Sequence, residues 1–270
     1  TIFVPSKTVC FNRASDDDYF NLEADKGIYN WDTEFEEFIK SEEVSNIVEI
    51  NFPSEGSTTN DVKLRITNYE EVLIREEDEG FIDEYYTLTE LAGDLSVDGV
   101  QQVTVSLSID YNDTGDPISA NGSLFVNPYT FSLAFTDSQA QSSSLTASIN
   151  EGATVLTSAS LTVIFEGTEK DELASANGFV QYLNIKLQGT ANITGANNAG
   201  DDFDANDFFD LELFDGENKI GDVVFVYEDD GFGFEEEIPY VEYSDGTREK
   251  LEDILEPLIS ELEDEFDDWG

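Results

Sequence analysis

The sequence predicts a mainly β protein: an antiparallel sandwich or meander with a short N-terminal helix and a C-terminal amphipathic helix, α+β overall. The first observation is that apolar residues alternate with Ser and Thr in several short runs, as in Val103–Ile109. The second is that clusters of Gly, Asn, Asp and Pro separate these runs, as tight turns require. Hydrophobic residues make up 39% of the 270 residues and aromatic residues 12%, which is enough apolar surface to drive folding.

The N-terminal region is predicted to be acidic and α+β. Asp32-Thr33-Glu34, followed by Phe35, Phe38 and Ile39, predicts a short helix with acidic residues at its positive end. Strands are expected over 44–52, 62–67 and 71–75. Residues 1–95 hold 24 acidic and 7 basic residues, whereas residues 96–165 hold 6 acidic residues and no base. We therefore expect an N-terminal region over 1–95 and an antiparallel β domain over 96–270, although a single domain fits the same pattern.

The rest of the chain predicts strands in series and then a helix. Strands are expected over 103–109, 131–135, 145–149, 161–165 and 180–185, a hairpin over 208–214 and 219–227, and a strand over 240–243. Asp215-Gly216 is the predicted hairpin turn. Thr247 is a candidate N-cap for a helix that Pro257 would kink or divide into two short helices. Its apolar face would consist of Leu251, Ile254, Leu255, Leu258, Ile259 and Leu262.

The net charge of -49 is the most unusual property of the chain. It has three explanations: adaptation to high salt, specific calcium binding, or a solvated surface on a secreted protein. Under each of them the charge repels nucleic acid, and no basic patch is present to neutralise phosphates. We therefore expect divalent cations as partners and no nucleic acid.

Two segments carry oxygen side chains at the alternate spacing of a calcium loop. The first consists of Asp110, Asn112, Thr114 and Asp116, with Gly115 at the sixth position. The second consists of Asp202, Asp204 and Asn206 and lacks the glycine. Calcium is the one cofactor that these patterns suggest. The alternative for both segments is a turn in which Asn and Asp side chains bind the nearby backbone.

Composition argues against most enzyme classes. The chain has no His and a single cysteine, Cys10, so histidine bases, Ser-His-Asp and Cys-His arrangements and zinc clusters are excluded. No Gly-rich phosphate loop is present. A carboxylate-only glycoside hydrolase survives these exclusions as the third reading of function. No apolar run approaches the ~20 residues of a membrane span.

The leading expectation is a secreted or cell-surface, non-catalytic protein with a structural, adhesive or assembly role in a cation-rich medium, such as a filament or surface-layer subunit. The alternative is an extracellular binding module for a glycan or a small apolar ligand. The chain contains no Met, which agrees with a removed leader or a trimmed start. Self-association is the expected partnership, and Ile2–Val4 is a candidate for pairing with the sheet edge of a neighbouring subunit.

Overall fold

The structure is a computed structural model that describes residues 22–78, 81–138, 141–167, 172–200, 203–229 and 235–256. The chain divides into two compact units, residues 1–135 and residues 136–270. The predicted boundary near residue 95 falls within a strand, β5, and the number of domains that fold independently stays a prediction.

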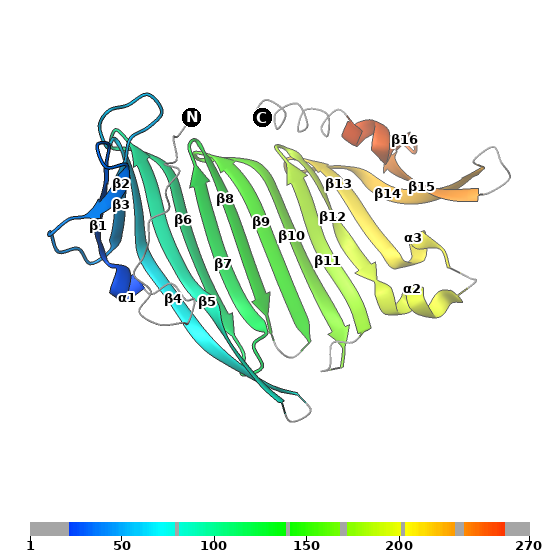
Figure 1. The fold of residues 1–270 in the computed structure, drawn as a ribbon. Helices are drawn as coiled ribbons and strands as arrows, with labels where there is room; N and C mark the ends of the chain where they lie inside the picture. The colour runs from blue at the N-terminus through cyan, green and yellow to red at the C-terminus, as the bar shows by residue number, and fades with distance from the viewer. Residues whose placement is uncertain are drawn as a thin grey trace. The chain divides into compact units, whose positions relative to one another are not determined.

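The chain is mainly β, with a few short helices (Figure 1). The elements of unit 1 are α1 (Leu22–Asp25), β1 (Gly27–Asp32), β2 (Glu37–Lys40), β3 (Val48–Phe52), β4 (Val62–Asp78), β5 (Phe81–Val97), β6 (Val100–Tyr111), β7 (Pro117–Val126) and most of β8 (Tyr129–Asp137). Unit 2 contains β9 (Ser142–Glu151), β10 (Thr154–Glu166), β11 (Glu172–Tyr182), β12 (Ile185–Asn192), α2 (Ile193–Ala199), α3 (Ala205–Phe208), β13 (Phe209–Asp215), β14 (Asn218–Asp229), β15 (Glu235–Tyr243) and β16 (Arg248–Lys250). A further helical turn covers residues 251–256.

The strands follow one another in a meander. Their order is β16-β15-β14-β13-β12-β11-β10-β9-β8-β7-β6-β5-β4-β3-β1-β2. The pairing is antiparallel between β1 and β2, from β3 to β7 and from β9 to β16, and parallel between β1 and β3. Of the two predicted arrangements, sandwich and meander, the meander within a single sheet is therefore confirmed, as is the hairpin at Asp215-Gly216.

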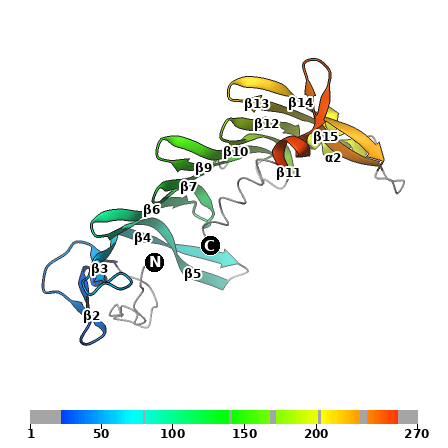
Figure 2. The same ribbon diagram turned by 90° about the horizontal axis from the view of Figure 1, so that it is seen from above.

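Each unit has one small hydrophobic core. In unit 1, α1 and strands β1, β3 and β4 contribute the buried side chains Leu22, Tyr29, Val48, Ile50, Phe52 and Val62. In unit 2, strands β13, β14 and β15 and the turn at 251–256 contribute Leu213, Val223, Val241 and Leu251. Between Asp94 and Asp204, by contrast, no described residue is buried. Within unit 2, strands β9 to β12 form a single layer, seen edge-on in Figure 2.

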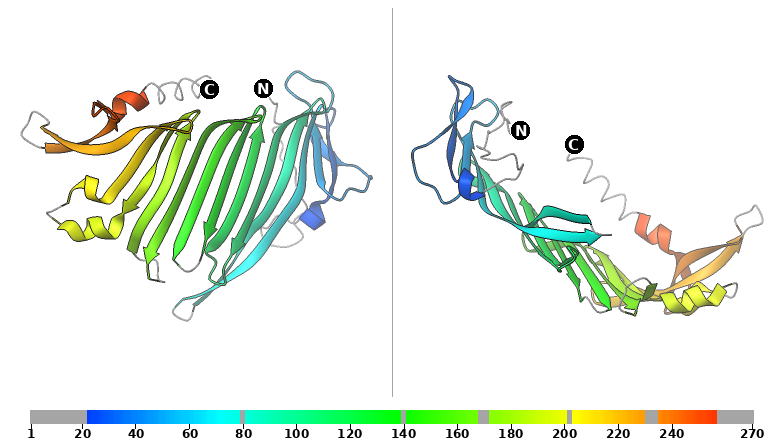
Figure 3. Two further views of the ribbon diagram at one scale, coloured as in Figure 1. Left: turned by 180° about the vertical axis from the view of Figure 1, so that it is seen from behind. Right: turned by 60° about the horizontal axis from the view of Figure 1, so that its bottom comes forward.

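Strands β4 and β5 extend past their neighbours in unit 1. The pairing of β5 with β6 begins at Glu90 and Ser108, so the stretch of hairpin from Glu71 to Leu88 pairs only with itself. Figure 3 shows this ribbon projecting beyond the ends of β6 and β7. The two strands predicted over 62–67 and 71–75 are thus one strand, β4, with register shifts after Ile66 and Glu70.

The predicted short helix over Asp32–Ile39 is wrong. The Asp32 carboxylate accepts hydrogen bonds from the backbone N–H groups of Glu34 (2.8 Å) and Phe35 (3.0 Å) and so begins a turn. That turn joins β1 to β2, where Trp31 pairs with Phe38 and their rings lie 5.1 Å apart. Of the apolar residues assigned to a helix face, Phe38 therefore forms a cross-strand contact, whereas Phe35 lies in the turn. The short N-terminal helix of the structure is α1, ahead of this segment.

Two further local predictions are corrected. Thr247 does not cap a helix, because its N–H and hydroxyl both donate to the Asp245 carboxylate in the turn between β15 and β16. The strand predicted over 180–185 is broken by a turn, in which Leu183 has a φ of 50°. Pro257, Leu258, Ile259 and Leu262 of the predicted C-terminal helix lie outside the described residues, as do Ile2–Val4 and Cys10.

Candidate functional site

The strands of unit 2 have one apolar face and one polar face. On β10, Leu161 pairs with Leu145 of β9 and with Gly178 of β11. Because paired residues in a sheet share a face, the side chains of Leu161 and Leu145 lie together, with Gly178 on the same face. The same face continues with the pairs Ala147–Ala159, Ala159–Val180 and Val180–Leu187. The opposite face carries Ser142, Ser144, Thr146, Ser148, Ser158, Ser160, Thr162, Asn177, Gln181, Gln188 and Thr190, with Phe179 and Ile164 among them.

The apolar face of unit 2 is covered at one end and open at the other. The helical turn at 251–256 lies over β13 to β15, where Leu213 is fully buried. Over β9 to β11, the side chains of Leu145, Leu161 and Val180 are 41%, 48% and 53% exposed. An antiparallel sheet normally packs one face on a core and leaves the other to water. On β9 to β11, the exposed face is instead the apolar one, which in such a sheet would normally pack on a core.

The strands of unit 1 also have one apolar face and one polar face. Val105 of β6 pairs with Gly93 of β5 and Leu124 of β7, and Leu107 pairs with Leu91 and Gly122. Ser106, between them, pairs with Ala92 and Ser123 on the other face. Leu124 is 39% exposed. We call the apolar side of β5 to β7, made by Leu91, Leu95, Val103, Val105, Leu107, Ile109, Leu124 and Val126, the unit 1 apolar face.

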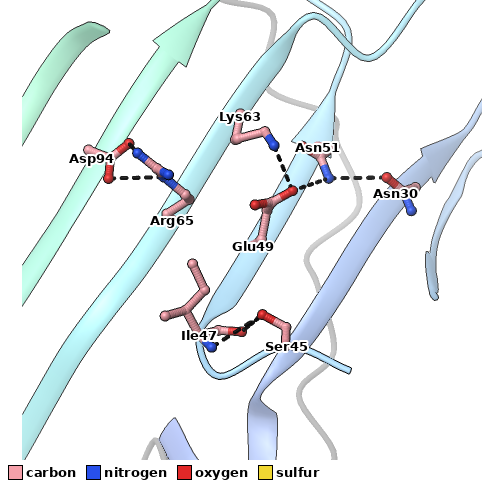
Figure 4. Close-up of polar contacts among 8 residues, drawn as sticks. All are labelled: Asn30, Ser45, Ile47, Glu49, Asn51, Lys63, Arg65 and Asp94. Atoms are coloured by element: carbon pink, nitrogen blue, oxygen red, sulfur yellow. Dashed lines mark hydrogen bonds and ion pairs between the residues drawn. The ribbon is translucent and has the colours of Figure 1, made fainter. Parts of the chain in front are cut away.

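The polar side of unit 1 holds a network of charges that Figure 4 shows in detail. Arg65 of β4 donates from Nε to both carboxylate oxygens of Asp94 on β5, at 2.9 and 3.1 Å, and from Nη2 at 2.7 Å. On β3, Glu49 lies 2.9 Å from the Lys63 ammonium and accepts from the Asn51 amide at 3.1 Å. This amide also donates to the Asn30 side chain of β1, so these contacts join β1, β3 and β4, beside the Arg65–Asp94 pair that joins β4 to β5.

The network changes the acidity of its members. Burial would raise the pKa of Glu49, but hydrogen bonds from Lys63 and Asn51 outweigh it and the pKa is lowered. The hydrogen bond to Asp94 raises the pKa of Arg65 further. Nearby, burial and a hydrogen bond to Glu71 raise the pKa of Tyr69 to about 12. All three shifts hold these groups in their ordinary ionisation states near neutral pH, which is typical of structural ion pairing and not of an acid-base catalyst.

The positive charges are all paired where the structure describes them. Seven of the nine described Lys and Arg side chains form ion pairs, and Lys40 and Lys186 lie over the rings of Tyr29 and Phe214. The seven are Lys26, Lys63, Arg65, Arg75, Lys219, Arg248 and Lys250. On the described surface, each base therefore already has a carboxylate or an aromatic ring as its partner before any anionic ligand binds.

The first predicted calcium segment forms a turn in which its members bind one another. The Asn112 side-chain oxygen accepts from the N–H groups of Thr114 (3.0 Å) and Asp116 (2.8 Å) and from the Thr114 hydroxyl. Asp116 accepts in turn from the Thr114 hydroxyl at 2.8 Å and from the Asn112 amide at 3.1 Å. Asp110, at the end of β6, accepts from the Ser119 hydroxyl at 2.6 Å. The turn brings Asn112, Thr114 and Asp116 together, and calcium binding by the segment stays a prediction.

The second predicted calcium segment begins helix α3. Asp204 is its N-cap, and the carboxylate accepts from the backbone N–H of Asn206 at 2.9 Å. The Asn206 amide binds both the N–H (2.7 Å) and the carbonyl (2.8 Å) of Phe225 on β14. Asp202 lies outside the described residues. Among the residues that the structure describes, no group of three or more His, Cys, Asp or Glu side chains is placed to hold a metal ion.

Comparisons with known proteins bring no identification: no family model matches the chain, and neither does any curated protein or solved structure. None of the described helices has the length and apolar character to cross a membrane. The open apolar faces are the feature that the sequence prediction missed. Their signal, strict apolar alternation in consecutive strands, was present in the sequence, but alternation alone does not reveal whether a second layer covers the face.

Proposed function

We propose that this chain is a non-catalytic, secreted or cell-surface protein that assembles with further copies of itself through the unit 1 apolar face. The observation that supports this proposal is that Leu124 is 39% exposed and that no residue of the unit 1 apolar face is fully buried, although Leu95 at its edge packs against the unit 1 core. Exposed apolar patches of a few hundred Å² on soluble proteins commonly mark interaction sites. The described site contributes no histidine base, nucleophilic pair or metal cluster that would support an enzyme instead.

The size of the face suits weak self-association. A residue in a sheet covers about 16 Å², from a strand spacing of about 4.8 Å and a rise of about 3.3 Å. The paired parts of β5, β6 and β7 therefore present roughly 450 Å² of sheet. A standard stable interface uses about 800 Å² per partner. Two such faces packed against each other would make a complex that forms with rising concentration.

Charge should control this assembly. Two copies that each carry a net charge of -49 repel each other at low ionic strength. Salt shortens the screening length to about 8 Å near 0.15 M and so removes most of this repulsion. The proposed assembly therefore belongs to a cation-rich medium, where apolar contact outweighs the screened charge.

Sedimentation velocity of the full chain at several concentrations, in low and high NaCl, tests the proposal. We expect the average mass to rise with concentration and with salt. Leu124→Glu should abolish this rise because it places a charge in the packed face. Ser123→Glu, the adjacent residue on the polar face, is the matched control and should assemble like the parent chain. A monomer under every condition, or equal loss in both variants, would refute the proposal.

The alternative proposal is a binding module for a small apolar ligand or a glycan on the same face. The same sample distinguishes the two: a monomer whose melting temperature rises with an apolar probe or a glycan indicates a binding module. A carboxylate-only glycoside hydrolase remains the third proposal. This third proposal predicts that the protein releases sugar from a glycan. The same preparation can be assayed for that activity.

A further inference from the structure

We propose that the apolar face of unit 2 is occupied by the chain's own C-terminal segment, residues 257–270. This segment lies outside the described residues, and the argument for it starts from what precedes it. The helical turn at 251–256 already packs on this face, where Leu251, Ile254 and Leu255 contact the strands of the unit 2 core. The segment therefore begins at an interface that is already formed.

The sequence of the segment has an apolar stripe of its own. In a helix of 3.6 residues per turn that begins at Pro257, one side would carry the five apolar residues Leu258, Ile259, Leu262, Phe266 and Trp269. On such a helix Asp264, Asp267 and Asp268 lie on the opposite side, Glu261 and Glu263 lie at the flanks, and Glu265 lies beside Leu258 at the edge of the apolar stripe. The segment thus has one side suited to an apolar sheet and one suited to water. Pro257 stands where a second helical stretch would begin, a position that proline favours.

The length of the segment matches the open surface. A helix over 257–269 would be about 20 Å long at 1.5 Å per residue. Strands lie about 4.8 Å apart, so this helix would cross about four of them. Four strands, β9 to β12, separate the covered end of the unit 2 face from the end of the unit.

The face itself can accept a helix. Apart from Glu151 at the end of β9, its positions on β9 to β11 carry no charge, and small residues make up much of it: Ala147, Ala159, Ala176 and Gly178. Small side chains let a helix approach the sheet closely, while Leu145, Leu161 and Val180 supply apolar area. Docking the segment would bury the three side chains that are most exposed on this face.

Disulfide trapping in the full-length chain tests this inference, in a Cys10→Ser background that removes the native thiol. Leu262→Cys is combined with Val180→Cys or with Leu161→Cys on the apolar face. The matched controls combine Leu262→Cys with Gln181→Cys or Thr162→Cys, the adjacent residues on the polar face. A disulfide needs Cα atoms about 4.4 to 6.8 Å apart. We expect an intrachain disulfide to form several-fold faster in at least one apolar-face variant than in its control.

The result separates this inference from the proposed function. Equal rates on both faces, or no intrachain disulfide in any variant, would overturn the C-terminal docking. Disulfides that form only between chains would also overturn it, and would indicate that a second copy occupies the unit 2 face. Leu258→Glu combined with Leu262→Glu provides a readout without cysteine, because it should increase the binding of an apolar dye. The assembly test depends on Leu124 in unit 1, so either proposal can fail while the other stands.

Discussion

Glycine residues allow the strands of this thin sheet to lie close together. A Cβ atom added to Gly178 of β11 would lie 2.2 Å from the carbonyl oxygen of Ser160 on β10, and one added to its partner Gly189 would lie 2.2 Å from that of Asp210. Neither glycine has a positive φ, so the requirement is space and not backbone conformation. The neighbouring backbone would have to move before a side chain fitted at either position.

Gly178→Ala should therefore lower the free energy of unfolding by about 1–3 kcal/mol, the usual cost of forcing atoms into a packed site. The measurement is urea denaturation followed by circular dichroism. Gly122→Ala is the matched control, because its added Cβ would meet only the Leu107 side chain, at 3.6 Å. That variant should be neutral or slightly more stable. Equal stability of the two alanine variants would show that β10 and β11 do not approach this closely.

At the scale of the elements, burial differs sharply between strands that share the same alternating pattern. Leu213 of β13 is fully buried, whereas Leu133 of β8 is 47% exposed. The difference comes from the elements that lie over the strands and not from the strands themselves. The helical turn at 251–256 covers β13, and no described residue buries the side chain of Leu133.

Leu213→Ala should consequently lower the free energy of unfolding by about 2–5 kcal/mol, since it leaves a cavity in the unit 2 core. Leu133→Ala removes the same atoms from a half-exposed position and should cost less than about 1 kcal/mol. Thermal and urea unfolding of both variants measure the contrast. If Leu133→Ala cost as much as Leu213→Ala, a layer that the described residues do not include would have to cover β8.

Alternation predicted the strands well, but it did not predict their ends or their covering. Val103–Ile109 alternates without interruption, and β6 forms there. The Asp32–Ile39 segment has helical spacing, yet the contact between Trp31 and Phe38 makes it a hairpin. That contact depends on where β1 pairs, which local sequence does not encode. Of the predicted calcium residues, Asn112, Thr114 and Asp116 lie in a turn, whereas Asp110 lies at the end of β6 and Asp204 and Asn206 begin α3; calcium binding by either segment stays a prediction.

For the whole molecule, the dominant property is the unbalanced charge. We expect the melting temperature to rise by similar amounts in NaCl, MgCl₂ and CaCl₂ at matched ionic strength, relative to EDTA in low salt, because screening relieves repulsion between carboxylates. The reason to expect little selectivity is that Asn112, Thr114 and Asp116 already bind one another. A larger rise with Ca²⁺ that disappears in Asp116→Asn would contradict this and identify the loop as a selective site.

The sequential order of the strands also bears on how the protein is made. Apart from the exchange of β1 and β2 at one edge, every strand pairs with the strands that precede and follow it in the sequence. Each new pairing then closes only a short loop, which costs little chain entropy and favours rapid folding. During synthesis, the last finished strand can act as a template for the next one to emerge. The sheet can therefore grow from its N-terminal edge in step with translation, without waiting for the distant end of the chain.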